Sequence, residues 1–230
     1  MTLALFDVDG TLTTQHTWKA LMVGFARQGL KRGTHRAFLA LHYPLYMLHK
    51  LGLLSQETFR RRWAGDLAWY FRGLTAAQLA PVLAAALDFL QQHWRPEGLA
   101  RLREHLAQGH RVVLVSAAPE PLLQVIGRAL GTGHIVGTRM EQRGRVYTGR
   151  HVPPVCIGPA KAQRARAYVR AQGWQVDWTT AHAYADAISD LPLLELVGRP
   201  AVIAPDPQLQ AVAQQRGWPV VAPTPAKTAQ

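Results

Sequence analysis

Residues 3–12 read LALFDVDGTL, and they carry the strongest structural signal in the chain. Residues 3–8 are apolar except for Asp7, which predicts a short buried strand followed by a loop. Asp7 and Asp9 end this strand, and side chains two residues apart on an extended chain point the same way. Adjacent carboxylates repel unless a cation or a shared proton compensates them, and magnesium suits oxygen ligands. The alternative is a strand-end turn with two solvated acids.

Beyond this segment, apolar residues between Thr17 and Leu90 recur at helical spacing. Four potential breaks predict that this block forms four or five helices: Gly33, Pro44, Gly52 and Gly73. After residue 96 the pattern alternates. It predicts helices at 99–107, 119–130, 159–172, 191–197 and 207–216, strands at 112–115, 135–137, 179–184, 201–204 and 220–221, and a hairpin at 142–149.

Strands that alternate with helices predict an α/β fold whose parallel sheet is covered on both faces. The helical block lies between the first and second strands, so we expect a separate cap over the carboxyl ends of the strands, where such sheets place their sites. The predicted domains are a core at 1–13 and 96–223, an all-helical cap at 14–95, and a flexible tail at 224–230.

Composition restricts the class of protein. The 230 residues include 48% apolar residues and a single cysteine, Cys156, which predicts a buried core and favours a reducing, cytoplasmic setting. The formal net charge is +12, and residues 13–95 hold 11 basic and 3 acidic residues. A basic cap attracts phosphorylated molecules or acidic lipid surfaces, although a merely solubilising surface has the same composition. No motif supports nucleic-acid binding.

Three later signals add polar residues at strand ends and helix starts. Ser116 follows the strand RVVLV and could hold a phosphate oxygen or cap the next helix. Lys161 lies near a helix start, where a cation opposes the helix dipole; a solvated lysine is the alternative. Asp186 and Asp190 occur in YADAISDLP; Asp186 could bind magnesium, and Asp190 could contact Lys161 or cap a helix.

Taken together, these motifs resemble the haloacid-dehalogenase-like hydrolase superfamily, and within it subfamily IB, which includes phosphoserine phosphatase. The resemblance covers Leu3 to Thr14 and Pro96 to Val221 and implies a Rossmann-like core with an inserted helical cap. It implies a magnesium-dependent phosphatase that forms an aspartyl-phosphate. The implied roles are as follows: Asp7 is the nucleophile, Asp9 the acid/base, Ser116 the phosphate-binding residue and Lys161 the neutralising lysine. Asp7, the backbone carbonyl of Asp9 and Asp186 bind the metal, and Thr11, Ser189 and Asp190 support the site.

Departures from this pattern concern the substrate. His16 stands where phosphoserine phosphatases place a glutamate for the substrate ammonium, so we expect phosphoserine to be a poor substrate. Arg32 and Arg36 are candidate substrate contacts in the cap, beside the apolar run Ala37–Leu48. This run could line an acyl-chain groove, lie at a membrane interface, or simply pack within the cap.

The expected partner is a small phosphorylated substrate, and peripheral contact with an anionic membrane is a further expectation. A lipid phosphate such as phosphatidylglycerophosphate is the alternative substrate. A silent module that binds anionic ligands is the alternative from another class, but the four acids argue against it because such a binder needs only cations. Dehalogenation is disfavoured because displacing a halide requires neither a metal nor a leaving-group acid. The substrate and the oligomeric state stay open.

Overall fold

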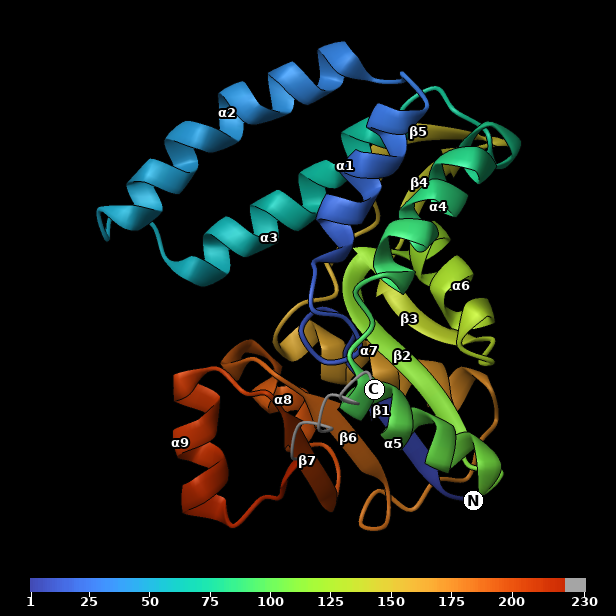
Figure 1. Ribbon diagram of the computed structural model, residues 1–230, viewed down its shortest axis with the longest axis vertical. Helices are drawn as coiled ribbons and strands as arrows, with labels where there is room; N and C mark the ends of the chain where they lie inside the picture. The colour runs from blue at the N-terminus through green and yellow to red at the C-terminus, as the bar shows by residue number, and fades with distance from the viewer. Residues whose placement is uncertain (222–230) are drawn as a thin grey trace, which may run out of the picture.

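The computed structural model describes residues 1–221, and the predicted tail at 224–230 lies outside them. Its centre is a six-stranded parallel sheet in the order β3-β2-β1-β6-β7-β8. The strands are β1 (Leu3–Phe6), β2 (Arg111–Pro119), β3 (His134–Thr138), β6 (His182–Ala185), β7 (Arg199–Ile203) and β8 (Val220–Val221). The predicted α/β class with a parallel sheet is confirmed (Figure 1).

Helices cover both faces of the sheet. Successive residues of β1 point to opposite sides, and all four are buried, so apolar side chains have to be covered on each face. Ala4 and Phe6 pack in a cluster with α5 (Pro96–Ala107) and α6 (Glu120–Ala129). Leu3 and Leu5 pack in a second cluster with the helices of the other face. These are α7 (Pro159–Ala171), α8 (Leu191–Leu194) and α9 (Pro207–Arg216). The carboxyl ends of β1, β2 and β6 therefore meet at one edge of a sheet that is buried on both faces.

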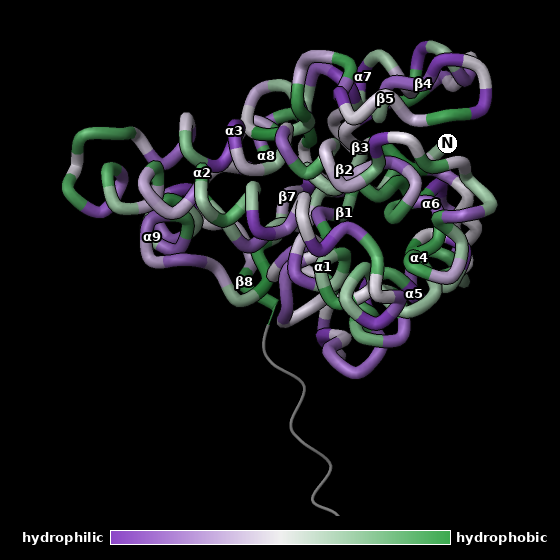
Figure 2. Tube along the Cα trace, turned by 90° about the horizontal axis from the view of Figure 1, so that it is seen from above, coloured by the Kyte–Doolittle hydropathy of each residue, from purple (hydrophilic) through white to green (hydrophobic). Residues whose placement is uncertain are grey.

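The inserted block forms α1 (Thr17–Arg27), α2 (Arg32–Lys50), α3 (Gln56–Asp66), the short 3-10 helix η1 (Leu67–Phe71) and α4 (Ala76–Gln91). The block does not have a hydrophobic core of its own. Buried residues of α1 and α4 belong to the same cluster as Phe6 of the sheet. In contrast, α2 and α3 form an arm, residues 32–66, that extends away from the sheet (Figures 1 and 2).

Two of the predicted helix breaks are wrong, because Gly33 and Pro44 both lie inside α2. Gly33 is in the first turn, where the helix loses little by its presence. Pro44 is exposed, so the carbonyl of Ala40, which receives no hydrogen bond from Pro44, can be solvated. Gly52 and Gly73 do follow helix ends and have positive φ angles of 75° and 76°.

The predicted hairpin is confirmed as the antiparallel pair β4 (Met140–Arg143) and β5 (Val146–His151). It packs on the inserted block, because Tyr147 exchanges backbone hydrogen bonds with Leu74 and Gly73 at 2.9 and 2.8 Å. A segment that follows the sheet's second and third strands thus supports the helical insertion from the side. The division into core and cap domains stays a prediction.

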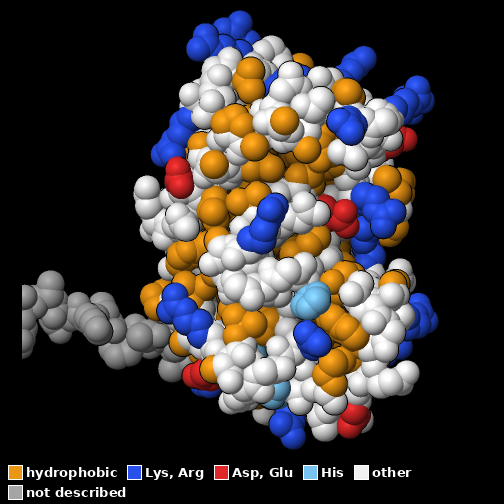
Figure 3. Space-filling model, turned by 90° about the vertical axis from the view of Figure 1, so that its right-hand side faces the viewer, with side chains coloured by type: hydrophobic (Ala, Val, Ile, Leu, Met, Phe, Trp, Pro, Cys, Tyr) orange, Lys and Arg blue, Asp and Glu red, His pale blue; other side chains and the backbone are white. Residues whose placement is uncertain are grey.

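Basic side chains are scattered over the face that α4, α6 and the hairpin form (Figure 3). Among residues 1–221, no helix combines the length and apolar character that crossing a membrane would require.

Candidate active site

The loop that follows β1 is held in place by close contacts. Arg95 donates from Nε to the carbonyl of Gly10 at 2.7 Å and forms an ion pair with Glu97 at 3.0 Å. Gly10 has a φ of 86°, and a Cβ added there would lie 1.9 Å from Oδ2 of Asp186. Only glycine therefore lets the loop pass this close to the carboxylate.

Asp7 is the first residue of this loop, and its side chain is only 2% exposed. Its Oδ1 accepts a hydrogen bond from Nζ of Lys161 at 2.5 Å, and the same Nζ lies 2.6 Å from Oδ1 of Asp190. Lys161 is 4% exposed, so the alternative of a solvated lysine is wrong. Burial alone would lower the pKa of Lys161, but Asp190 and Asp7 raise it above its ordinary value.

The hydroxyl of Thr11 lies between the carboxylates of Asp7 and Asp186. It lies 3.3 Å from Oδ2 of Asp7 and 3.2 Å from Oδ1 of Asp186, which follows β6. Asp7, Asp186 and Asp190 each offer one carboxylate oxygen, and these oxygens lie within 4.8 Å of one another. Burial raises the pKa of Asp186 to about 8, with Asp7 and Asp190 adding to the effect. Burial likewise raises the pKa of Asp190 to about 6, although Lys161 opposes it.

This donor set fits a divalent cation. Two of the three clustered carboxylates are buried and that of Asp186 is half-buried. One ammonium, that of Lys161, contacts Asp7 and Asp190, which leaves negative charge that one cation would compensate. Oxygen ligands from carboxylates are those that magnesium prefers. Asp7, Asp186 and Asp190 are therefore the side chains that could hold the ion.

Asp9 turns its carboxylate toward the insertion instead. Oδ1 accepts the backbone N–H of Thr17 at 2.7 Å, and Oδ2 accepts the Thr17 hydroxyl at 2.9 Å. Thr17 is the first residue of α1, so Asp9 accepts from an N–H group at the helix start that has no partner within the helix. Burial raises the pKa of Asp9, whereas His16 and Thr17 lower it. The Asp9 carboxylate is not among the three clustered carboxylates.

Ser116 lies within β2 where the register of the strand pair shifts, between Val115 and Pro119. Its Oγ accepts the backbone N–H of Ala118 at 3.1 Å, and the side chain is 1% exposed. The next helix, α6, begins after Pro119 and has no side-chain cap. The alternative that Ser116 caps this helix is therefore wrong.

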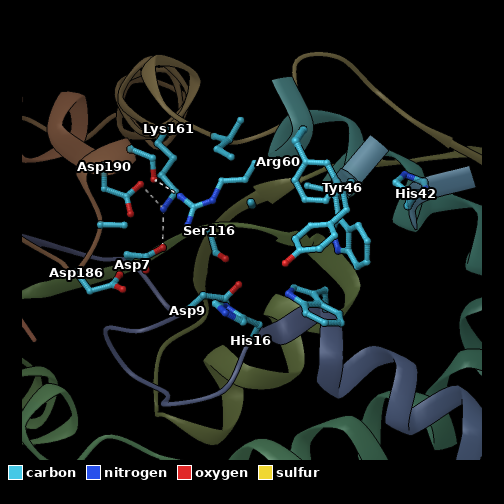
Figure 4. Close-up of a pocket in the computed structure, with 18 of the residues that line it drawn as sticks. Asp7, Asp9, His16, His42, Tyr46, Arg60, Ser116, Lys161, Asp186 and Asp190 are labelled. Carbon is cyan, nitrogen blue, oxygen red and sulfur yellow. Dashed lines mark hydrogen bonds and ion pairs between the residues drawn. The ribbon is translucent and has the colours of Figure 1, made fainter. Parts of the chain in front are cut away.

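A cavity of about 510 Å³ opens beside these groups. Its far wall is aromatic and apolar and comes from the insertion: Trp18, Leu39, Tyr43, Tyr46, Phe59 and Trp63. Figure 4 shows the acids and Lys161 on one side of the cavity and Tyr46 on the other. The four acids that line the cavity are Asp7, Asp9, Asp186 and Asp190, and its other described lining residues carry no carboxylate.

Arg60 of α3 reaches across the cavity to the short 3-10 turn η2 (Ile188–Asp190), which follows β6. Its Nη1 donates to Oγ of Ser189 at 3.2 Å, and its charge slightly opposes the rise that burial causes in the pKa of Asp190 (Figure 4). Arg60 is one of three consecutive arginines, residues 60–62, and was not among the predicted site residues. Nothing in the spacing distinguishes it from Arg61, which forms an ion pair with Glu57 on the exposed side of the same helix.

The structure brings most of the predicted site residues to this cavity. His16 lines it at the start of α1 and stacks on Trp18, with ring centroids 6.0 Å apart. Thr11 is buried beside the carboxylates, and Ser189 is on the cavity wall. Arg32 and Arg36 are exposed on α2 and do not line the cavity.

Comparisons with known proteins agree with this geometry. Residues 4–195 match the family model of haloacid dehalogenase-like hydrolases. A probable phosphatase of Mycobacterium tuberculosis is 34% identical over 96% of this chain and 75% of its own length. A phosphoserine phosphatase of the same species is 31% identical over 94% of this chain and 69% of its own length. The crystal structure of a Bordetella pertussis protein of unknown function superposes with a TM-score of 0.82 and 27% identity, covering 96% of this chain and 99% of that protein.

A parallel sheet with buried acids and a lysine at its carboxyl edge defines a hydrolase of the haloacid-dehalogenase type. The chain belongs to the haloacid dehalogenase-like hydrolase family. The predicted family and fold are confirmed, as is the predicted enzyme class, a phosphatase of this family.

Proposed function

We propose that this enzyme is a magnesium-dependent phosphatase that hydrolyses a phosphomonoester through an aspartyl-phosphate on Asp7. The observation that supports it most is the arrangement of Asp7, Asp186 and Asp190 around Lys161. Bound magnesium would supply positive charge against the carboxylates and the phosphoryl group. The cytoplasmic setting stays a prediction.

The chain's own residues account for the two steps. An oxygen of Asp7 attacks phosphorus, the bond to the leaving oxygen breaks, and a proton from Asp9 goes to that oxygen. Asp9 then takes a proton from the water that hydrolyses the aspartyl-phosphate. The raised pKa of Asp9 favours the protonated form that the first step needs. Lys161 and Ser116 offer a charge and a hydroxyl to the phosphoryl oxygens.

The cavity favours a leaving group that is apolar and carries no ammonium. Its aromatic wall offers no unassigned carboxylate, and His16 stands at its edge. A substrate ammonium would therefore be desolvated without a partner, which is unfavourable. We infer that a phosphomonoester with an aromatic or aliphatic alcohol is preferred over phosphoserine. A lipid phosphate is one such ester.

The test is steady-state phosphate release from phenyl phosphate, phosphoserine and a phosphatidylglycerophosphate, each with magnesium and with chelator. We expect magnesium-dependent turnover with phosphoserine the poorest of the three. The Asp7→Asn variant should lose several orders of magnitude in kcat, because an amide is a poor nucleophile. The matched control is Asp88→Asn on the exposed surface of α4, which should retain full activity. Acid-quenched wild type should carry a phosphoryl group on the peptide containing Asp7.

Retention of a tenth of the wild-type activity in Asp7→Asn, or full activity after chelation, would contradict the mechanism. A preference for phosphoserine would contradict only the inference about the leaving group.

A further inference from the structure

The α2–α3 arm, residues 32–66, has an outer face that no other part of the described chain covers. Phe38 and His42 of α2 are fully buried, and both rings pack against Trp63 of α3. Leu41, Met47 and Leu48 are 39%, 42% and 40% exposed. At about 100° per residue, Met47 and Leu51 fall opposite Phe38 and His42, and Leu41 and Leu48 lie on the flank of α2 between the two sides.

The tip of the arm is still more exposed. Leu51 and Leu53, in the turn between the two helices, are 69% and 74% exposed. Viewed from above, the tip is hydrophobic and extends beyond the sheet and its helices (Figure 2). These two leucines at the end of an extended arm do not pack in the core of the fold. Their exposure to water is unfavourable, and a partner surface that covered them would remove that unfavourable free energy.

The Lys and Arg side chains of α2 face no acid on the same helix, and the two acids of the arm, Glu57 and Asp66, lie on α3, where they pair with Arg61 and Arg62. Residues 10–56 contain six basic residues and no acidic residue. Three of the basic residues, Arg32, Arg36 and Lys50, are exposed on α2. At about 100° per residue they lie within about 40° of one another, along the edge of the apolar face. An apolar face bordered by exposed cations matches an anionic interface with an apolar interior.

We propose that the arm docks on the surface of an anionic lipid bilayer. Leu51 and Leu53 insert below the headgroups, and Arg32, Arg36 and Lys50 meet the lipid phosphates. The contact is peripheral, because no helix among the described residues could cross the membrane. A second copy of the chain fits this face less well, since a symmetric contact would oppose cations to cations.

The docking would place the catalytic cavity beside the lipid surface. Leu39, Tyr43 and Tyr46, on an adjacent side of the same helix, line that cavity. The proposal goes beyond the proposed function, and it can be tested without any substrate.

The experiment is flotation of the purified full chain with vesicles of equal parts phosphatidylcholine and phosphatidylglycerol, and with pure phosphatidylcholine. We expect flotation with the anionic vesicles only, fading as NaCl rises from about 0.05 to about 0.5 M because the ions screen the attraction. The Leu51→Asp/Leu53→Asp variant should partition at least about tenfold less, since it loses insertion and adds negative charge. Its hydrolysis of phenyl phosphate in solution should be unchanged.

A charge-matched pair separates the arm from the overall charge of the chain. The variant Arg32→Gln/Arg36→Gln/Lys50→Gln should lose binding. The variant Arg103→Gln/Arg143→Gln/Arg145→Gln removes as many exposed cations from α5 and the β4–β5 hairpin and should retain it. The proposal would be overturned if both glutamine variants lost binding equally, or if the wild-type chain did not float. It would also be overturned if the leucine variant floated as well as the wild-type chain. Light scattering that shows a dimer dissociated by the leucine substitutions would overturn it too, because the occupant would then be a second copy.

Discussion

At the scale of single residues, the site depends on space as much as on charge. Gly10 lets Asp186 come within reach of Thr11 and Asp7, because a Cβ at residue 10 would overlap its carboxylate. The motif DVDGT shows that a glycine follows the two acids, but not that the glycine faces an acid 176 positions further along the chain.

Gly10→Ala should displace Asp186 and reduce kcat at least about 100-fold, since a misplacement of about 1 Å can have that effect. The control is Gly52→Ala, which has a similarly positive φ but nothing within 4 Å of the added Cβ. It should cost about 1 kcal/mol of stability from backbone strain and leave turnover intact. Thermal unfolding and steady-state kinetics separate the two effects. Equal kinetics in the two variants would exclude crowding of Asp186 as the cause.

The raised pKa values of Asp186, about 8, and Asp190, about 6, predict how metal binding depends on pH. Without metal, these acids keep their protons in the folded state up to a higher pH than in the unfolded chain, where the pKa of an aspartic acid is near 4. Their contribution to stability is therefore present at low pH and is lost as pH rises toward 8. Magnesium binds the ionised forms, so its stabilising effect should grow in the same window.

The measurement is the rise in Tm on adding magnesium at about pH 5.5 and about pH 8, each against chelator. We expect the larger rise at the higher pH. Asp186→Asn should reduce that rise. A magnesium effect that is equal at both pH values would contradict the assignment of these carboxylates to the cation.

The residues of the site could be predicted from the sequence to the extent that they directly follow strands. Asp7 and Asp186 directly follow β1 and β6, and Ser116 lies in β2 just beyond its last pairing with β1, so the topology brings all three to one edge of the sheet. Lys161 follows from the same logic because it lies in the first turn of α7. Arg60 could not be found this way, because the path of α3 over the cavity depends on packing within the arm.

At the scale of elements, α3 connects the insertion to the turn η2 through Arg60. Replacing Arg60 with Gln should lower kcat/KM at least about tenfold, as expected for the loss of a charged hydrogen bond in the cavity. Arg61→Gln is the neighbouring control, because Arg61 is exposed and pairs with Glu57. Comparable losses in both variants would indicate a general charge effect instead of a contact in the site.

The helix pattern of α2 also shows where sequence reasoning failed. A helix breaker acts through the hydrogen bond that it removes, and Pro44 removes one on the side that faces water. The sequence shows that a proline is present at position 44, but not whether that proline faces water or the protein interior. The β4–β5 hairpin was predicted from its turn, yet its packing on Leu74 and Gly73 comes from tertiary contacts alone.

At the scale of the whole molecule, one hydrophobic cluster runs from the sheet through α1 and α4. We expect the sheet and these helices to unfold together in one transition. Leu21→Ala, at a fully buried position of α1, should cost about 2–5 kcal/mol and lower this single transition without splitting it. Calorimetry would show two transitions if the insertion were an independent folding unit.

Two hydrogen bonds from Thr17 hold the Asp9 carboxylate, the proton donor of the proposed mechanism, against the start of α1. In the proposed mechanism this carboxylate passes a proton to the leaving oxygen and later receives one from water, and the first turn of α1 sets its direction. Since α1 shares its packing with the sheet, this direction is fixed before any substrate arrives. A movement of the arm beyond α1 on substrate entry would therefore leave the direction of the Asp9 carboxylate unchanged.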